Sequence, residues 1–438
     1  MKGSCGQAIV DPKAEQPTFV LQNDIGPCKT DGLIFKASNV TLDLNGKTIK
    51  GTPLVGPASN PTGGFGEGVG IRLVGNSWVR IINSKPTGGI TEFDAGIVIQ
   101  RGEQSPARGN LVRNVRVYNN VGRQSGVGGV GCDQPASEGS CEVSDFNDGI
   151  SLVGAENSAI GPGNVVESNG SGGIRIDDGS VNNAIVGNTI RNNLGNGVRF
   201  MALSSFNVVS GNTITGNASG VNFSFQNPDN VVEDNTIDAN HRFGVSTSWQ
   251  SQRTLIRNNT VTNNRSGGIN LTSGENTVTG NQVLDNGKGT GTGRGNGIFV
   301  ASGTDNFPRV RTTVSGNTVR GSGGNGIRIS CMVDQRDPTT EGGTYELYGC
   351  LVWDTGNRVE NNTVYGNAVN APIGTKAQAG LPTTQVIGWY DLVDSTNADA
   401  TQSPYDPSGQ PLTDCSTNVW SGNSGTGMTA YPACAAGS

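Results

Sequence analysis

Residues 173–196 read GIRIDDGSVNNAIVGNTIRNNLGN, and residues 197–219 read GVRFMALSSFNVVSGNTITGNAS. Each stretch opens with a glycine followed by Ile or Val, and an Asn-Thr-Ile phrase begins 15 residues after that glycine. The Gly-Ile/Val pair recurs in steps of 24, 24, 23, 24 and 24 residues, at Gly149, Gly173, Gly197, Gly220, Gly244 and Gly268. Such a period is typical of a solenoid, in which no repeat can bury its apolar face without a neighbour.

Aligning the repeats places small apolar residues in four columns. The first two columns are two residues apart, which is the spacing of side chains on one side of a β-strand. Repeated Gly-Asn pairs and the enrichment in Val, Ile and Thr disfavour helix. The columns are Ile174, Val198, Val221, Val245, Ile269; Ile176, Phe200, Phe223, Thr247, Leu271; Ile185, Val209, Val232, Ile256, Val278; and Ile190, Ile214, Ile237, Val261, Val283. We predict an all-β, single-stranded parallel β-helix, with coils stacked at about 4.8 Å.

Two columns of asparagine accompany the apolar ones. Asn tolerates left-handed backbone conformations at turns, and its amide can bond to the same residue one coil away. We therefore predict structural ladders, with an asparagine-lined binding stripe as the alternative. The columns are Asn188, Asn212, Asn235, Asn259, Asn281 and Asn193, Asn217, Asn240, Asn264, Asn286.

Weaker copies extend the repeat from Gly32-Leu33 to Asn362-Thr363-Val364. We expect about eleven coils over residues 32–370, an N-terminal cap over 1–31, and an irregular C-terminal tail or end cap over 371–438. The cap would cover the open strand edges of the first coil. Insertions at about 121–147, 286–296 and 331–357 predict loops on one side of the solenoid.

Composition excludes some partners. The chain has 438 residues, 68 of them glycine, and a formal net charge of −6. It carries no basic stripe, so nucleic acid is not expected as a partner. No apolar run approaches 18 residues, so we expect no membrane span.

The eight cysteines fall into four pairs of near neighbours, without the short spacings of a metal site. This pattern favours disulfides and an oxidising compartment, with reduced thiols as the alternative. The pairs expected are Cys5 with Cys28, Cys132 with Cys141, Cys331 with Cys350, and Cys415 with Cys434. Residues 1–10 hold no signal peptide, so we expect a mature, secreted chain rather than a cytosolic one.

The phrase Gly-Ile/Val-x-Ile/Phe followed by Gly-Asn-Thr-Ile resembles the repeat of the pectate-lyase-like superfamily, in its NosD-like, carbohydrate-binding and sugar-hydrolase form. The resemblance covers roughly residues 32–370 and implies a right-handed parallel β-helix and an extracellular polysaccharide as partner. Of the polygalacturonase-type motifs, only Asp177-Asp178 is matched, and Arg328-Ile329 continues into Ser330. The Asp-Pro-His motif of mannuronan epimerases is absent, so the fold does not choose the activity.

The residue between the first two apolar columns should face outward. That outward column reads Ser151, Arg175, Arg199, Asn222, Ser246, Asn270, Phe299 and Arg328. Arg175 and Arg199, one coil apart and beside Asp177, could hold the carboxylates of a uronate polymer. The alternative is an exposed ladder of ordinary surface salt bridges.

Other residues complete the predicted site. His241, the sole histidine, and Arg242 are candidates for acid–base and carboxylate-binding roles, with turn chemistry as the alternative for His241. Phe225 and Trp249 could stack on sugar rings, and the predicted substrate contacts are Asn222, Phe225, Trp249, Asn270 and Arg328.

Asp177 and Asp178 have two further interpretations. They could form a glycosidase acid–base set, or they could bind Ca²⁺, for which Asp145 and Asp148 are a second candidate pair. Calcium is the one cofactor that the sequence suggests, and an ordinary acidic surface is the alternative.

The leading hypothesis is a secreted enzyme that cleaves a uronic-acid-containing polysaccharide by lyase-type β-elimination. Its catalytic residues would be Arg175, Asp177, Arg199, His241 and Arg242. A glycoside hydrolase or uronan epimerase on the same fold, and a non-catalytic carbohydrate-binding or adhesive module, are the alternatives. An ice-binding solenoid would need a regular Thr array, which the mixed outward column does not provide.

Overall fold

The computed structural model describes residues 1–10, 16–52, 68–120, 148–248, 250–289, 295–302, 311–331, 356–367, 390, 392–395, 418–431 and 433–436. Contacts divide the chain into two compact units, Met1–His241 and Arg242–Ser438. The sequence did not indicate a division at this point. Each unit is described separately below.

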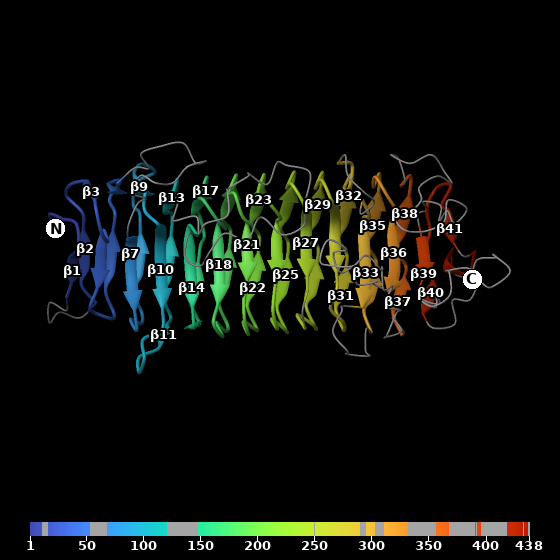
Figure 1. Cartoon of the computed structure of the whole chain (residues 1–438), viewed down its shortest axis with the longest axis horizontal. Helices are drawn as coiled ribbons and strands as arrows, with labels where there is room; N and C mark the ends of the chain where they lie inside the picture. The colour runs from blue at the N-terminus through green and yellow to red at the C-terminus, as the bar shows by residue number, and fades with distance from the viewer. Residues whose placement is uncertain are drawn as a thin grey trace, which may run out of the picture. The chain divides into compact units, whose positions relative to one another are not determined.

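Unit 1 contains three parallel sheets, A, B and C, to which each turn of the chain adds one strand (Figure 1). Sheet A holds β1 (Gln7–Ile9), β4 (Leu33–Phe35), β7 (Val69–Val74), β10 (Ala95–Gln100), β14 (Ile150–Val153), β18 (Ile174–Asp177), β21 (Val198–Phe200) and β24 (Val221–Phe223). Sheet B holds β2 (Thr18–Val20), β5 (Thr41–Asp43), β8 (Arg80–Ile82), β12 (Leu111–Arg113), β16 (Ala159–Ile160), β19 (Ala184–Val186), β22 (Val208–Ser210) and β25 (Val231–Glu233). Sheet C holds β3 (Ile25–Cys28), β6 (Thr48–Gly51), β9 (Gly89–Thr91), β13 (Arg116–Tyr118), β17 (Val165–Glu167), β20 (Thr189–Arg191), β23 (Thr213–Thr215) and β26 (Thr236–Asp238). A separate pair joins β11 (Ala107–Arg108) to β15 (Ala155–Glu156).

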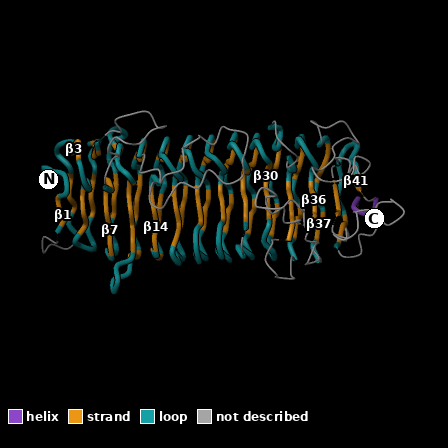
Figure 2. Tube along the Cα trace, viewed as in Figure 1, coloured by secondary structure: helices purple, strands orange, loops and turns teal. Residues whose placement is uncertain are grey.

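Unit 2 repeats the same arrangement. Its sheet A strands are β27 (Phe243–Thr247), β30 (Gly267–Leu271), β33 (Ile298–Ser302), β36 (Ile327–Cys331), β39 (Leu392–Ser395) and β41 (Ala430–Tyr431). Sheet B has β28 (Leu255–Arg257), β31 (Thr277–Thr279), β34 (Thr313–Ser315), β37 (Arg358–Glu360) and β40 (Val419–Ser421), and sheet C has β29 (Thr260–Thr262), β32 (Gln282–Leu284), β35 (Thr318–Arg320) and β38 (Thr363–Tyr365). The 3₁₀ helix η1 (Ala433–Ala436) is the one helical element among the described residues, drawn purple in Figure 2.

The fold class predicted from the sequence is confirmed. Between Leu33 and Tyr365 the described strands form eleven successive triplets, seven in unit 1 and four in unit 2, each with one strand from each sheet. The strands pair in parallel and in register, as in Ile174↔Val198 and Ile176↔Phe200. No helix in the described part of the chain is long and apolar enough to cross a bilayer.

The core is the set of apolar columns that the sequence predicts. The first two columns lie on the inner side of sheet A, the third on sheet B and the fourth on sheet C, and every member is at most 1% exposed. Phe200 and Phe223 stack in adjacent coils, with their ring centroids 4.3 Å apart. Burying one such side chain contributes about 1.5–3 kcal/mol.

The glycine that opens each repeat is required by packing. A Cβ built on Gly197 would lie 2.4 Å from Cγ2 of Ile214 and 2.7 Å from the carbonyl oxygen of Gly220. The chain passes so close to the sheet C side chain and to the next coil that only glycine fits. This close approach explains the constant Gly-Ile/Val phrase.

The asparagine columns form the predicted ladders. In unit 1 Asn188 donates from Nδ2 to the carbonyl oxygen of Ile160, 2.8 Å away, and to Oδ1 of Asn212, 3.0 Å away. The backbone N–H of Asn188 also donates to that Oδ1, at 2.9 Å. Each amide therefore links three successive coils. The sequence analysis missed a third ladder of the same kind, formed by Asn183, Asn207 and Asn230.

The conformational reason given for the asparagines needs correction. The left-handed backbone occurs at the residue before each ladder position, as in Gly187 (φ 64°) and Asn192 (φ 54°), and the ladder asparagines themselves are not in that conformation. Asn is required at the ladder because it both donates and accepts while buried. Gly and Asn precede it because they adopt positive φ at low cost.

The proposed division into cap, helix and tail stays a prediction. Residues 7–28 already carry β1, β2 and β3, which pair in parallel with β4, β5 and β6. Beyond residue 370, β39 pairs with β36, and β40 pairs with β37. Regular pairing therefore continues past both proposed boundaries in the described residues.

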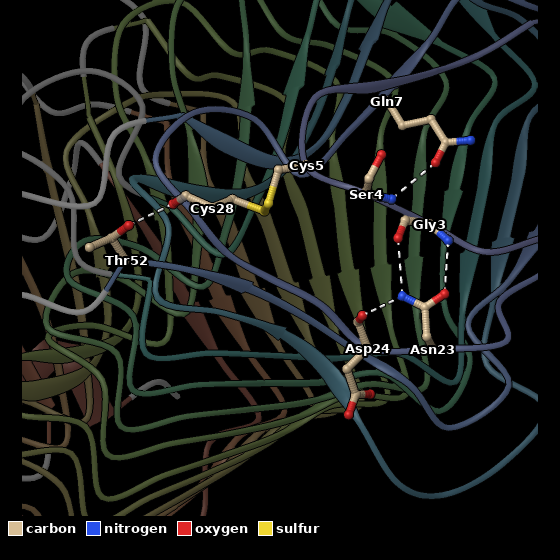
Figure 3. Close-up of a disulfide and its surroundings, with 8 residues drawn as sticks. All are labelled: Gly3, Ser4, Cys5, Gln7, Asn23, Asp24, Cys28 and Thr52. Atoms are coloured by element: carbon tan, nitrogen blue, oxygen red, sulfur yellow. Dashed lines mark hydrogen bonds between the residues drawn. A yellow bond between two sulfur atoms is a disulfide. The ribbon is translucent and has the colours of Figure 1, made fainter.

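The first coil is closed by a disulfide. Cys5 is bonded to Cys28, as predicted, and reciprocal hydrogen bonds of 3.0 Å join the Asn23 side chain to the backbone N–H and carbonyl of Gly3 (Figure 3). Cys434 is also disulfide-bonded. Cys132, Cys141, Cys350, Cys415 and the side chain of Cys331 lie outside the described residues.

Replacing Cys5 and Cys28 together by serine should lower the free energy of unfolding by about 3 kcal/mol, because the bond closes a loop with a sequence separation of 23. Urea denaturation of both proteins, with and without reductant, measures the difference. Reductant should destabilise the double variant less than the parent. Equal stability of the parent and the variant would show that the bond does not hold the first coil.

Asn188→Asp should cost about 2–4 kcal/mol at neutral pH. A carboxylate cannot donate to Ile160 or Asn212, so two buried acceptors lose their partner. Acidic pH should partly restore stability, because a protonated Asp can donate. Asn182→Asp is the control, because Asn182 is exposed and its φ of 56° suits Asp equally well. Equal effects of the two substitutions, read by chemical denaturation, would contradict a role for the ladder.

Candidate functional site

The predicted outward column lies on sheet A of unit 1. Ser151, Arg175 and Arg199 are direct neighbours on β14, β18 and β21, and Asn222 follows on β24. Their side chains alternate with inward residues such as Ile174 and Ile176. The register therefore brings the two arginines onto adjacent strands.

This part of the column is not an open surface. Ser151 is 0% exposed and Arg175 is 7% exposed, although both lie on the outer side of the sheet. The sequence alternative of an exposed salt-bridge ladder therefore does not describe Arg175. A buried guanidinium needs nearby acceptors or negative charge to remain charged.

Two aspartates meet that need. Asp177, two residues further along β18, forms an ion pair with Arg175, and its side chain is 14% exposed. Asp148, one coil earlier, interacts with Arg175 through its charge and accepts a 2.7 Å hydrogen bond from the backbone N–H of Gly172. Arg175 is thus held between two carboxyl groups of the protein itself.

An earlier pair of coils contains a similar Asp–Arg interaction, but with one aspartate instead of two. Asp31 accepts a 2.8 Å bond from the backbone N–H of Val69, and Arg72 binds both oxygens of Asp31, at 2.7 and 3.1 Å. The register makes Asp31 the equivalent of Asp148. In the position of Asp177, the strand of Arg72 has the exposed residue Val74.

The pKa values of Asp148 and Asp31 shift in opposite directions. Burial raises the pKa of Asp148 above its usual range, and the charges of Arg175 and Arg199 and the Gly172 hydrogen bond offset only part of this effect. Burial alone would also raise the pKa of Asp31, but the hydrogen bonds from Arg72 and Val69 outweigh it, so that pKa is lowered. Asp148 therefore favours its neutral form more than an ordinary aspartate does.

Arg199 differs from Arg175 in its surroundings. The coil before it has Gly172 where Arg175 has Asp148, and Met201 follows two residues later where Arg175 has Asp177. Arg199 is half-buried, and its side chain makes no ion pair or hydrogen bond with any residue that the structure describes. Its Nε and the hydroxyl of Ser151 are buried polar atoms without such a partner. Ser151 is inaccessible, but the part of the Arg199 guanidinium that remains exposed could bond an anionic ligand.

The other predicted residues of unit 1 lie elsewhere or are engaged. Asn222 accepts a 2.8 Å bond from the Ser224 hydroxyl on sheet A. Phe225 is 45% exposed in the turn that follows β24. The backbone N–H of His241 donates to Asn217 in the turn after sheet C, so His241 is not part of the outward column of sheet A.

The calcium interpretation gains no support from the geometry. Asp177 is paired with Arg175, and Asp178 is paired with Arg101 at 2.9 Å. In the described ranges no three His, Cys, Asp or Glu side chains gather as a metal site. Asp145 lies outside those ranges.

Unit 2 carries the remaining predicted residues. Asn270, Phe299 and Arg328 occupy neighbouring strands in one outward column, and the guanidinium carbon of Arg328 lies 5.9 Å from the centre of the Phe299 ring. Burial lowers the pKa of Arg328 to about 10. Arg242 accepts a backbone bond from Ser266, and Trp249 lies outside the described residues.

Sequence reasoning missed three features of unit 1. From the sequence, Asp148 was considered only as a possible calcium ligand. Its pattern, an Asp two residues before an inward Leu or Ile followed by an Arg in the next coil, also occurs at Asp31 and Arg72. The exposed rings of Trp78 and Phe206 were not singled out. The sequence feature that could have identified both rings is an aromatic residue directly before a position of the ladder that contains Asn183 and Asn207.

Comparisons with known proteins agree with this architecture. The family model described as "Periplasmic copper-binding protein (NosD)" matches residues 132–307. A solved phage structure, the Dettilon tailspike protein, is 18% identical with a TM-score of 0.52, and the match covers 80% of this chain and 59% of the tailspike chain, less than two thirds of it. No curated protein sequence matches the chain.

Two alginate epimerases are also similar in structure. The periplasmic epimerase AlgG is 12% identical with a TM-score of 0.41, covering 80% of this chain and 68% of its own. The A-module of the mannuronan C-5 epimerase AlgE4 of Azotobacter vinelandii is 14% identical with a TM-score of 0.42, covering 80% and 86%. The parallel sheets, the family-model match and the tailspike match show that the chain is a right-handed parallel β-helix repeat protein.

The two equivalent aspartates should affect stability in opposite ways as pH changes. A raised folded-state pKa makes the Asp148 contribution greatest below about pH 4, where the unfolded carboxyl is protonated, and reduces it as pH rises through the folded pKa. Asp148→Asn keeps an acceptor for Gly172, so we expect it to be as stable as the parent, or more stable, at pH 7, with a flatter pH profile.

Asp31→Asn is the matched control. Its lowered pKa stabilises the folded state above about pH 4, and that contribution is lost as pH falls through the folded value. This variant should therefore be less stable than the parent at pH 7. Urea unfolding between pH 3 and pH 8 measures both profiles, and profiles of the same sign would refute the assignment.

Proposed function

We propose that this protein is a secreted, carbohydrate-active β-helix enzyme that cleaves a uronic-acid-containing polysaccharide by β-elimination. The observation that carries the proposal is Arg199, a half-buried guanidinium without an ion-pair partner among the described residues. Such a group favours a planar anion, which it can bind through two parallel hydrogen bonds. A sugar carboxylate is the anion that a polysaccharide of this class supplies.

In the proposed reaction, Arg199 neutralises the sugar carboxylate and so makes the neighbouring C5 proton more acidic. Asp177, held by Arg175 on the adjacent strand, is the candidate base. The C5–H bond breaks as Asp177 takes the proton, a C4–C5 double bond forms, and the C4–O4 bond breaks as the leaving oxygen takes up a proton from solvent water. Asp148, whose pKa is raised by burial, also interacts with Arg175 through its charge.

The other predicted residues keep subordinate roles. Asn222 and Phe225 are proposed sugar contacts next to Arg199 on unit 1. His241 and Arg242 remain proposals for proton transfer and carboxylate binding, and Trp249, Asn270 and Arg328 remain proposals for sugar contacts.

Arg199→Ala should lower kcat/KM on a uronate polymer by about 100-fold or more, because the charge that the transition state needs is removed. The assay follows ultraviolet absorbance of unsaturated products from pectate, alginate, glucuronan and glycosaminoglycans, with reducing-sugar release in parallel. Arg113→Ala, an exposed arginine at the end of β12, should leave the rate unchanged.

The outcomes separate the competing functions. Reducing ends without ultraviolet absorbance would indicate a hydrolase, and a changed uronate composition without cleavage would indicate an epimerase. Binding without any product would favour a non-catalytic module. Full activity in Arg199→Ala would remove the arginine from the mechanism.

A further inference from the structure

Two aromatic residues on one corner of unit 1 adopt a backbone conformation that is costly for bulky side chains. The residue before each ladder position has positive φ, and in the described part of unit 1 it is mostly Gly, Asn, Asp, Ser, Ala or Glu, although Leu203 (φ 63°) and Gln226 (φ 57°) are further exceptions. On the corner between sheets A and B it is Trp78 (φ 59°) in one coil and Phe206 (φ 57°) in another. Positive φ is costly for bulky side chains.

Burial does not compensate for that cost. Trp78 is 56% exposed and Phe206 is 58% exposed. Neither ring therefore gains the stability of a core aromatic. A local rule broken without a folding benefit is expected where a residue serves function.

The Trp78 ring also packs against the backbone of the next coil. A Cβ on Gly109, the equivalent residue of the next coil, would lie 2.4 Å from ring atoms of Trp78. The backbone N–H of Trp78 donates to the Arg108 carbonyl of that coil at 2.9 Å. Glycine thus lets the indole pack against the next coil, while more than half of Trp78 remains accessible.

The two rings belong to one line along the corner. Backbone hydrogen bonds connect the corner coil by coil, and the residues in this line are Trp78, Gly109, Asn157, Asn182 and Phe206. At about 4.8 Å per coil, Trp78 and Phe206 are about 19 Å apart. The side chains of Asn157 and Asn182 between them are exposed and form no hydrogen bond within the described residues.

This alternation indicates the chemistry of the occupant. A protein partner would favour a contiguous apolar patch, whereas along this line exposed amides separate the two rings, and further exposed apolar side chains, Leu203 and Phe225, lie only near the Phe206 end. A polysaccharide presents apolar C–H faces for stacking and hydroxyl groups for amide hydrogen bonds. The spacing of one coil is also close to the length of one sugar residue.

We propose that this corner of unit 1 is a second carbohydrate-binding site, in which Trp78 and Phe206 stack on sugar rings of an extended polysaccharide and Asn157 and Asn182 bond the hydroxyls between them. The site is separate from the Arg199 column, and it depends on the proposed function only for the class of ligand. Its role is to hold the polymer along the coil axis.

The test is the double variant Trp78→Asn/Phe206→Asn. Asn is the residue found at equivalent positions with positive φ, such as Asn39 and Asn157, so folding should be preserved or improved. Binding is measured by affinity electrophoresis in gels containing alginate, polygalacturonate or hydroxyethyl cellulose. We expect the apparent affinity for at least one polymer to fall about tenfold or more, a change of about 1.4 kcal/mol.

Leu194→Asn is the matched control. Leu194 is 46% exposed in the turn after sheet C, away from the proposed line, and its loss should not change retardation. Equal retardation of the parent and the double variant, or no retardation of the parent in any gel, would overturn the proposal. So would self-association of the parent, seen by sedimentation, that the double variant lacks without any change in retardation.

The result is independent of catalysis. If Arg199→Ala retains full activity, or if no product forms at all, the proposed function fails while retardation in the gels still decides this site. If the parent cleaves a polymer and the double variant binds that polymer as tightly, this site fails and the proposed function stands. A decrease in affinity together with unchanged cleavage of short oligosaccharides supports both.

Discussion

The buried asparagine at the corners of each coil is the constraint on which the structure depends. Where the chain turns from one sheet to the next, it leaves backbone donors and acceptors that the strands do not pair, and no water reaches them. The asparagine amide donates to a carbonyl and accepts a backbone N–H of the coil before it, and it donates to the asparagine of the coil after it, as Asn212 does with Ile185, Asn188 and Asn235. Each coil therefore needs its neighbours for its hydrogen bonds as well as for its core.

This constraint leaves the outer residues free to vary. The inner columns are almost entirely apolar and the ladders are mostly asparagine, but the outward column of sheet A changes from Ser151 to Arg175, Arg199 and Asn222 within four coils. The pairs Asp31–Arg72 and Asp148–Arg175 have equivalent positions in the coil, but the pKa values of their aspartates shift in opposite directions. The same backbone holds both aspartates, and the deeper burial of Asp148 reverses the direction of its pKa shift.

Much of the fold could be predicted because it repeats. A period near 24 residues aligned Val198 with Ile174 and Asn212 with Asn188 correctly, and both columns are buried as expected. The alignment also placed Arg175 and Arg199 on neighbouring strands. It could not show that Arg175 is buried and paired with Asp177, because burial on the outer side of a sheet does not follow from the period. The left-handed residues were misplaced by one position, because the residue with positive φ, such as Gly187 or Asp234, directly precedes the ladder asparagine.

The sequence by itself determined which residues face the core, because burial of a narrow apolar interior recurs at every coil and leaves a period that can be counted. It also determined the Cys5–Cys28 bond, through pairing with the nearest cysteine. Only the tertiary structure decided which charges are neutralised by ion pairs and which exposed aromatic rings pack against a neighbouring coil. Arg199 lacks an ion pair such as the one that Arg175 makes with Asp177, and Gly109 supports Trp78. Both facts depend on contacts between different coils, and such contacts arise only when the chain is wound.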